Sequence, residues 1–114
     1  MGTKIESRVM KDVAIVDIHG QITIGEGDEK LKDTIDKLIA DGKKKILINL
    51  KKVSFMDSSG IGELVGCYTT VSRGGGKLKL VNLNEKVHDL LEITQLIRVF
   101  EIHSDEQKAV ASFA

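Results

Sequence analysis

Two short apolar runs enclose a segment of helical periodicity, and this arrangement constrains the fold more than any other feature of the 114-residue sequence. The first run is "KILINL" at 45–50 and the second is "KLKLVN" at 77–82. Between them, apolar residues recur at the three- and four-residue spacing of a helix, which ends at the glycine triplet 74–76. The sequence therefore predicts a β-α-β unit, with "KILINL" as a central strand covered on both faces.

The N-terminal part predicts an antiparallel hairpin that leads into a helix. β-Branched residues alternate with polar ones in 4–10 and recur in 13–20, and Lys11 and Asp12 form the tight connection. A short β-rich piece, Ile22 to Ile24, follows before glycines interrupt it. Helical spacing then predicts a helix over 28–41.

The C-terminal part continues the alternation of helix and strand. Asn84 has the side chain of a helix cap, "IRVFEI" at 97–102 is typical of a last strand, and Ser104 with Gln107 has the spacing of a capping box for a terminal helix. We therefore expect an α/β fold: one domain over 1–114, with a mixed, mostly parallel central sheet, an opening hairpin and about four helices.

Composition excludes several classes of function. Lys plus Arg equals Asp plus Glu at 17 each and aromatics are 4%, so the chain lacks the basic field and the stacking residues of a nucleic-acid binder. Cys67 is the only cysteine and the histidines show no paired metal spacing, so we predict no disulfide, no metal and no cofactor. No apolar run has the length of a signal or membrane segment, and we expect a cytoplasmic protein without membrane insertion.

The stretch "SFMDSSGIGELVG" at 54–66 lies where the β-α-β unit passes from strand to helix. We expect the central strand to end near Leu50, a loop to cover 51–56, and the helix to begin at Ser58 or Ser59. Functional sites in open α/β sheets tend to lie beyond the carboxyl ends of strands, in this kind of junction.

Two interpretations of this junction stay open on the residues alone. In the first, Asp57 or Ser58 caps the helix, Gly60 and Gly62 allow close packing, and no chemistry occurs. In the second, a serine is phosphorylated, because a helix N-terminus offers donors and positive potential to a phosphate. A serine hydrolase is disfavoured because no Gly-x-Ser-x-Gly turn surrounds Ser58 or Ser59, and we predict no catalytic residue and no enzyme.

A resemblance favours the second interpretation. The stretch "VSFMDSSGIGELVG", with the preceding "KILINL" and the following "GGGKLKLVNLNEKVHDLLEITQL", resembles the STAS domain of bacterial anti-sigma factor antagonists. In that family the serine directly after the aspartate is phosphorylated by the anti-sigma factor, which is a serine kinase. The resemblance implies that Ser58 is this serine, that the unphosphorylated protein binds the kinase and releases a sigma factor, and that a phosphatase resets the switch.

The resemblance also implies roles for neighbouring residues. Three would support the phosphorylated loop: Asp57, Ser59 and Gly60. Four would contact the partner, three on the helix and one in the loop 20–28: Ile61, Gly62, Glu63 and Ile24. That loop reads "GQITIGEGD" where many family members carry an acidic Gly-Glu-Leu-Asp-like stretch. The loop that would contact the partner therefore departs from the family pattern.

The competing hypothesis is a constitutive scaffold of the same fold. Such a module would be part of a stress-sensing assembly, or a partner subunit of a lipid-transport assembly, and would carry no phosphorylation switch. The sequence weakly opposes it, because the acceptor hydroxyls beside Asp57 are retained although a fixed interface does not require them.

Overall fold

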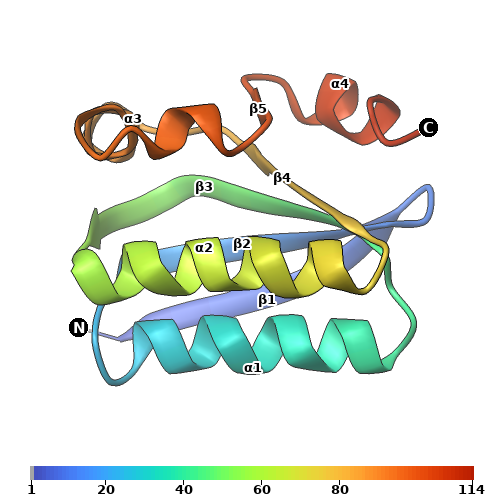
Figure 1. Cartoon of the computed structure of the whole chain (residues 1–114), viewed down its shortest axis with the longest axis horizontal. Coiled ribbons are helices and arrows are strands. Elements are labelled where there is room, and N and C mark those ends of the chain that lie inside the picture. The colour runs from blue at the N-terminus through green and yellow to red at the C-terminus, as the bar shows by residue number, and fades with distance from the viewer. Residues whose placement is uncertain (1) are drawn as a thin grey trace.

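The computed structural model describes residues 2–114 and shows a five-stranded sheet whose strands follow the order of the chain, β1-β2-β3-β4-β5 (Figure 1). β1 is antiparallel to β2, and every other neighbouring pair is parallel. The strands and helices are β1 (Thr3–Met10), β2 (Val13–Ile22), α1 (Gly27–Ala40), β3 (Lys45–Met56), α2 (Ser58–Arg73), β4 (Lys77–Val81), α3 (Glu85–Ile93), β5 (Ile102–His103) and α4 (Glu106–Ala111). The predicted fold class is confirmed, with β3 in the middle of the sheet.

The opening hairpin is confirmed together with its connection. Lys11 and Asp12 both have positive φ, 51° and 66°, which is the backbone of a two-residue turn that matches the twist of the flanking strands. Met10 pairs with Val13 across this turn, and pairing continues to Thr3 and Gly20.

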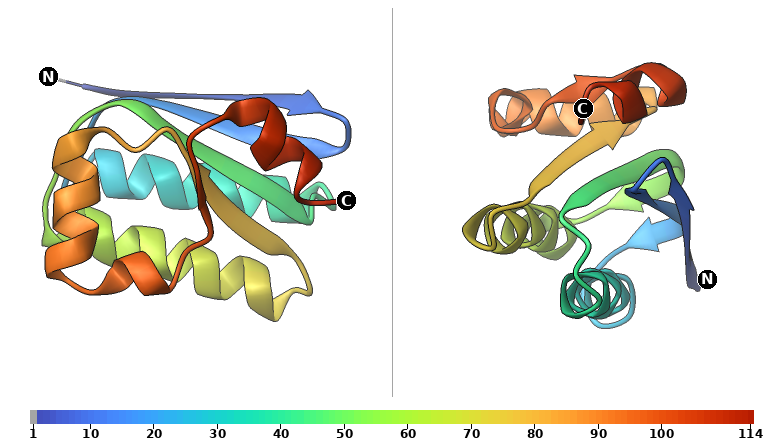
Figure 2. Two further views of the ribbon diagram at one scale, coloured as in Figure 1. Left: turned by 90° about the horizontal axis from the view of Figure 1, so that it is seen from above. Right: turned by 90° about the vertical axis from the view of Figure 1, so that its right-hand side faces the viewer.

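The two faces of the sheet are covered unequally. Alternate residues of β3 point to opposite sides: Ile48 joins the large core formed with α1, α2 and α3, and Leu47 joins a small cluster with Phe113 beside α4. Figures 1 and 2 show α1 and α2 side by side on one side of the sheet and α4 on the other. Of the helices in residues 2–114, none combines the length and the hydropathy that a bilayer-spanning segment requires.

The prediction that the central strand ends near Leu50 and a loop covers 51–56 is wrong. β3 continues to Met56, which pairs with Ile22 at the end of β2. The pairing register shifts twice along β2, between Asp17 and His19 and between Gly20 and Gln21, which breaks the two-residue alternation that a regular strand shows in sequence. As a result β3 delivers Asp57 directly to the start of α2.

The prediction of a separate short β-strand at Ile22 to Ile24 is also wrong. Ile22 is the last residue of β2, and Ile24 lies in a turn in which Gly25 has a φ of 98°. α1 then begins at Gly27, one residue before the predicted start.

Two predictions near the C-terminus need correction. A strand over 97–102 is wrong: Leu96–Arg98 forms a turn of 3₁₀ helix, Phe100 packs edge-to-face on Tyr68 at 5.3 Å, and β5 is only Ile102–His103. The terminal helix is capped by Asp105, whose carboxylate accepts the Lys108 N–H at 3.1 Å, one residue after the predicted Ser104.

Candidate functional site

The junction between β3 and α2 is organised by Asp57. This residue is extended, with φ −98° and ψ −174°, and its Oδ1 accepts a hydrogen bond from the Gly60 N–H at 2.9 Å. Its own carbonyl accepts the first helical bond, from the Ile61 N–H at 3.0 Å. Asp57 is therefore the cap of α2, which decides between the two candidates, Asp57 and Ser58, that the sequence left open.

The second oxygen of the Asp57 carboxylate reaches a different segment. Oδ2 accepts the backbone N–H of Ile24 at 3.1 Å, so one side chain ties the turn before α1 to the start of α2. The bonds from Gly60 and then Ile24 stabilise the ionised carboxylate, which lowers the pKa of Asp57 from its ordinary value. Asp57 is thus a fixed negative charge directly before Ser58.

Glycine is required where this junction meets β2. A Cβ built on Gly60 would lie 2.0 Å from the carbonyl oxygen of Ile22, closer than any real contact. Gly27 has the same constraint at the start of α1, where a Cβ would lie 2.4 Å from the carbonyl oxygen of Gln21. The starts of α1 and α2 therefore both sit close against the end of β2.

The two serines differ in their exposure. Ser58 is the first residue of α2 and is exposed, whereas Ser59 is half-buried in the first helical turn. Among residues 2–114, neither hydroxyl has a hydrogen-bond partner. The Ser58 hydroxyl is consequently free to meet an incoming reagent, at a helix N-terminus whose first turn contains no acidic side chain.

The four residues expected to contact a partner are placed as follows. Ile24 is 75% exposed, Gly62 is exposed, Ile61 is half-buried, and Glu63 is half-buried. Glu63, which we expect to contact the partner, is half-buried instead of fully exposed, and its Oε2 accepts a hydrogen bond from the Cys67 thiol at 3.4 Å. Ile24, Gly62 and part of Ile61 are therefore the accessible members of the set.

Sequence reasoning missed Phe55 in this neighbourhood. Its side chain is 51% exposed near the end of β3, two residues before Asp57. It also lines a hollow of about 290 Å³ with Lys86, Val87 and Leu90 of α3. Strand alternation gives no signal for it, because Ser54 and Phe55 are both exposed between the buried Val53 and Met56, where the pairing register of β2 and β3 shifts.

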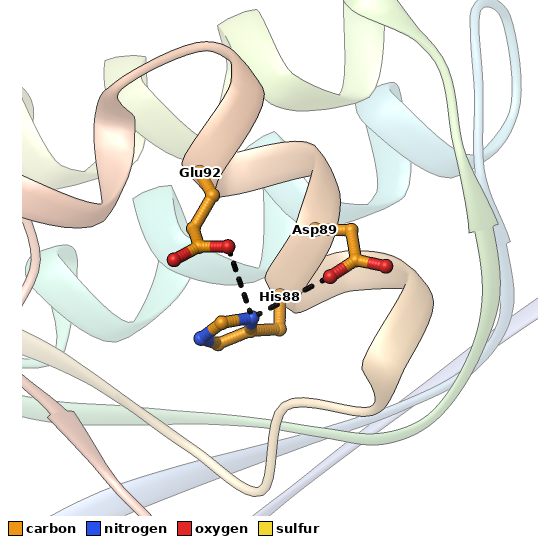
Figure 3. A group of neighbouring side chains, drawn as sticks. All are labelled: His88, Asp89 and Glu92. Atoms are coloured by element: carbon orange, nitrogen blue, oxygen red, sulfur yellow. Dashed lines mark ion pairs between the residues drawn. The ribbon is translucent and has the colours of Figure 1, made fainter.

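Other reactive side chains lie outside this junction. Cys67 is buried in α2, and burial together with the nearby Glu63 carboxylate raises the pKa of its thiol far above the usual range, which makes it unreactive. His88, Asp89 and Glu92 form an exposed group on α3 (Figure 3), with His88 Nδ1 at 3.7 Å and 3.9 Å from the two carboxylates. His88 and Glu92 lie one turn apart on this exposed helix face, where contacts between such neighbours are ordinary.

The fold and this junction match a known family. The family model for the STAS domain matches residues 4–109, and the chain therefore belongs to the STAS domain family.

Named relatives share most of the chain. It is 30% identical to the anti-sigma F factor antagonist of Paenibacillus polymyxa over 111 aligned residues. The aligned region covers 96% of this chain and 94% of the relative. The chain is 36% identical over 95 residues to the anti-sigma-B factor antagonist of Bacillus subtilis (strain 168), covering 83% and 85%. A crystal structure from Thermotoga maritima is 28% identical, with a TM-score of 0.88 over 96% of this chain and 93% of the other.

Proposed function

We propose that this protein is an anti-sigma factor antagonist that is switched by phosphorylation of Ser58. In this proposal the unphosphorylated protein binds an anti-sigma factor that is also a serine kinase, and the bound sigma factor is released. Two relatives carry the names of anti-sigma F and anti-sigma-B factor antagonists. The observation that carries the proposal is the free, exposed Ser58 hydroxyl directly after the capping carboxylate of Asp57.

The position of Ser58 suits phosphoryl transfer. The γ-phosphoryl group of ATP moves to Ser58 Oγ, the hydroxyl gives up its proton, and ADP leaves. Because Asp57 already caps the helix, the reaction consumes no hydrogen bond that holds α2 in place. Asp57 is in this proposal a positioning residue, since it fixes the backbone that presents Ser58.

Phosphorylation would release the partner through local electrostatics. A phosphate adds about −1.5 to −2 charges at pH 7, next to the ionised Asp57. The N-terminus of α2 accommodates this charge in the isolated domain, whereas an interface built around a neutral hydroxyl has to bury it. A phosphatase that removes the group restores the binding surface.

The partner surface proposed here surrounds Ser58 and contains Ile24, Ile61 and Gly62, with Phe55 at its edge. Ile24 and Phe55 are large apolar side chains that stay exposed in the isolated domain. Exposed apolar side chains grouped around a reactive hydroxyl are typical of a protein-docking surface. The half-buried Glu63 contributes at the rim.

The experiment incubates the protein with ATP and a serine-kinase anti-sigma factor from the same organism, and maps phosphate by mass spectrometry. We expect phosphate on Ser58 in wild type and in Ser59→Ala, and none in Ser58→Ala. Phosphate that persists in Ser58→Ala, or disappears in Ser59→Ala, contradicts the assignment. Absence of phosphate from all three proteins would favour the constitutive scaffold.

A further inference from the structure

The ladder between β4 and β5 is shorter than β4 itself, because only Leu80 and Val81 of β4 pair with β5. Leu80 N–H donates to the Glu101 carbonyl and Asn82 N–H to the His103 carbonyl, both at 3.0 Å, while Lys77 N–H donates to Lys44 on the β3 side at 2.7 Å. Strand residues alternate between the two sides, so Leu78 faces the same side as Leu80. Within residues 2–114, neither the N–H nor the C=O of Leu78 has a hydrogen-bond partner there.

This unpaired peptide group belongs to a buried residue. Leu78 is 2% exposed, and buried backbone N–H groups without a partner are rare in folded proteins. The cause is the path of the chain before β5, because the 3₁₀ turn at Leu96–Arg98 and the inward Phe100 ring hold residues 98–100 away from the first half of β4. A cavity of about 440 Å³ fills the gap, lined by residues 76–79 and 98–101 and by Tyr68 and Ser72 of α2.

The polar groups around this cavity are mostly free donors. Arg98 and Lys77 form no ion pair in the part of the chain that the structure describes, and the Tyr68 and Ser72 hydroxyls have no hydrogen-bond partner in that same part. The one carboxylate in the lining, Glu101, is already engaged by Lys79 at 2.9 Å and by His103 at 2.7 Å. The cavity therefore offers positive charge and unsatisfied N–H and O–H groups.

We propose that this cavity binds a small organic anion, a carboxylate or a phosphate, whose oxygens accept from the Leu78 N–H and pair with Arg98. Its volume lies in the range of small-molecule sites, and the Tyr68–Phe100 pair supplies an apolar wall. Arg98 provides the planar donor pattern that suits carboxylate and phosphate oxygens.

This site is separate from the junction around Ser58. Ser58 begins α2, whereas Ser72 lies in its last turn, so the two are about 20 Å apart along the helix axis at 1.5 Å per residue (Figure 1). The proposal therefore stands independently of the phosphorylation switch.

The test is a ¹⁵N-NMR titration of the whole protein with inorganic phosphate and, separately, with N-acetylphenylalanine as the carboxylate. We expect saturable shifts of the backbone amides of 76–79 and 98–101 with at least one probe, and the probe that saturates identifies the anion type. Amide hydrogen exchange gives an independent readout: Leu78 should exchange faster than Leu80 in the free protein and slow down when the probe binds. A Leu78 amide whose exchange the probes leave unchanged overturns the proposal.

Variants distinguish the site from general charge attraction. Arg98→Gln should weaken binding about tenfold, the loss expected when a charged hydrogen bond becomes a neutral one. The matched control is Arg73→Gln, an exposed arginine at the end of α2 that does not line the cavity, and its affinity should match that of wild type. Equal affinity of all three proteins, or non-saturating shifts spread over surface lysines, means an adventitious ion only and refutes the site.

Discussion

The Asp57 carboxylate and the Ile24 backbone N–H are joined by a 3.1 Å hydrogen bond across 33 residues of sequence. The same carboxylate caps α2 through Gly60. The turn that carries the exposed Ile24 and the helix that begins with Ser58 are consequently held in one arrangement by a single side chain.

Asp57→Ala should destabilise the domain and loosen the turn around Ile24. Loss of a helix cap predicts a fall in Tm of roughly 3–8 °C for a domain of this size. Thermal unfolding followed by circular dichroism measures it. The control is Asp33→Ala, an exposed aspartate in α1, which should leave Tm nearly unchanged; equal Tm values for both variants would show that the cap contributes nothing.

Acid should remove the contribution of Asp57. The bonds from Gly60 and Ile24 lower the pKa of the folded carboxyl below the value of about 3.9 in the unfolded chain, so the stabilisation is present above that value and is lost as pH falls through the folded pKa. Urea unfolding from about pH 7 to about pH 2 measures this loss. Asp57→Asn should lose less stability than wild type over that span, and parallel curves would refute the linkage.

Two glycines of α2 should respond in opposite directions to alanine. Gly60→Ala places a methyl group 2.0 Å from the Ile22 carbonyl oxygen and should cost about 1–3 kcal/mol or more of unfolding free energy. Gly62→Ala meets nothing within 4 Å and should stabilise the helix by about 0.5–1 kcal/mol. Chemical denaturation of the pair measures both, and a Gly60→Ala protein as stable as wild type would show that β2 and α2 are farther apart.

Ile24→Glu should weaken binding to the anti-sigma factor without changing the fold. A charge at the centre of an apolar contact costs at least about tenfold in affinity, whereas surface substitutions usually change stability by no more than about 0.5 kcal/mol. The matched control is Val9→Glu on β1. Val9 is also exposed, at 58%, and it pairs with Ala14 beside the hairpin turn, which lies at the opposite end of the sheet from the start of α2 (Figure 1). Equal weakening by both variants, or by neither, would place the interface elsewhere.

Much of the fold follows from local signals in the sequence. The hairpin at Lys11 and Asp12, the end of α2 at the glycine triplet, and the cap at Asn84 all depend on residues within one turn of the feature, and the structure confirms each of them. Asn84 Oδ1 accepts the Val87 N–H at 2.9 Å, as its position predicts.

The failures have non-local causes. β3 extends to Met56 because β2 offers a partner across two register shifts, and nothing within 51–56 encodes that pairing. The strand expected at 97–102 is replaced by a 3₁₀ turn at Leu96–Arg98 and by Phe100, whose ring packs in the core against Tyr68, so that only Ile102–His103 pairs with β4.

The candidate site divides in the same way. The sequence predicts the strand-to-helix junction and places Asp57, Ser58 and Gly60 in it. The sequence does not predict the hydrogen bond from Ile24 to Asp57, because this bond joins distant segments. It also does not predict the contact between Cys67 and Glu63, because this contact depends on which face of α2 is buried.

The most direct test of the switch is isothermal titration of the serine-kinase anti-sigma factor with unphosphorylated protein, Ser58-phosphorylated protein and Ser58→Ala. We expect tight binding of the unphosphorylated and Ser58→Ala forms and a loss of affinity of at least about a hundredfold on phosphorylation, the scale on which a buried uncompensated charge acts. Equal affinity of the phosphorylated and unphosphorylated proteins would contradict it.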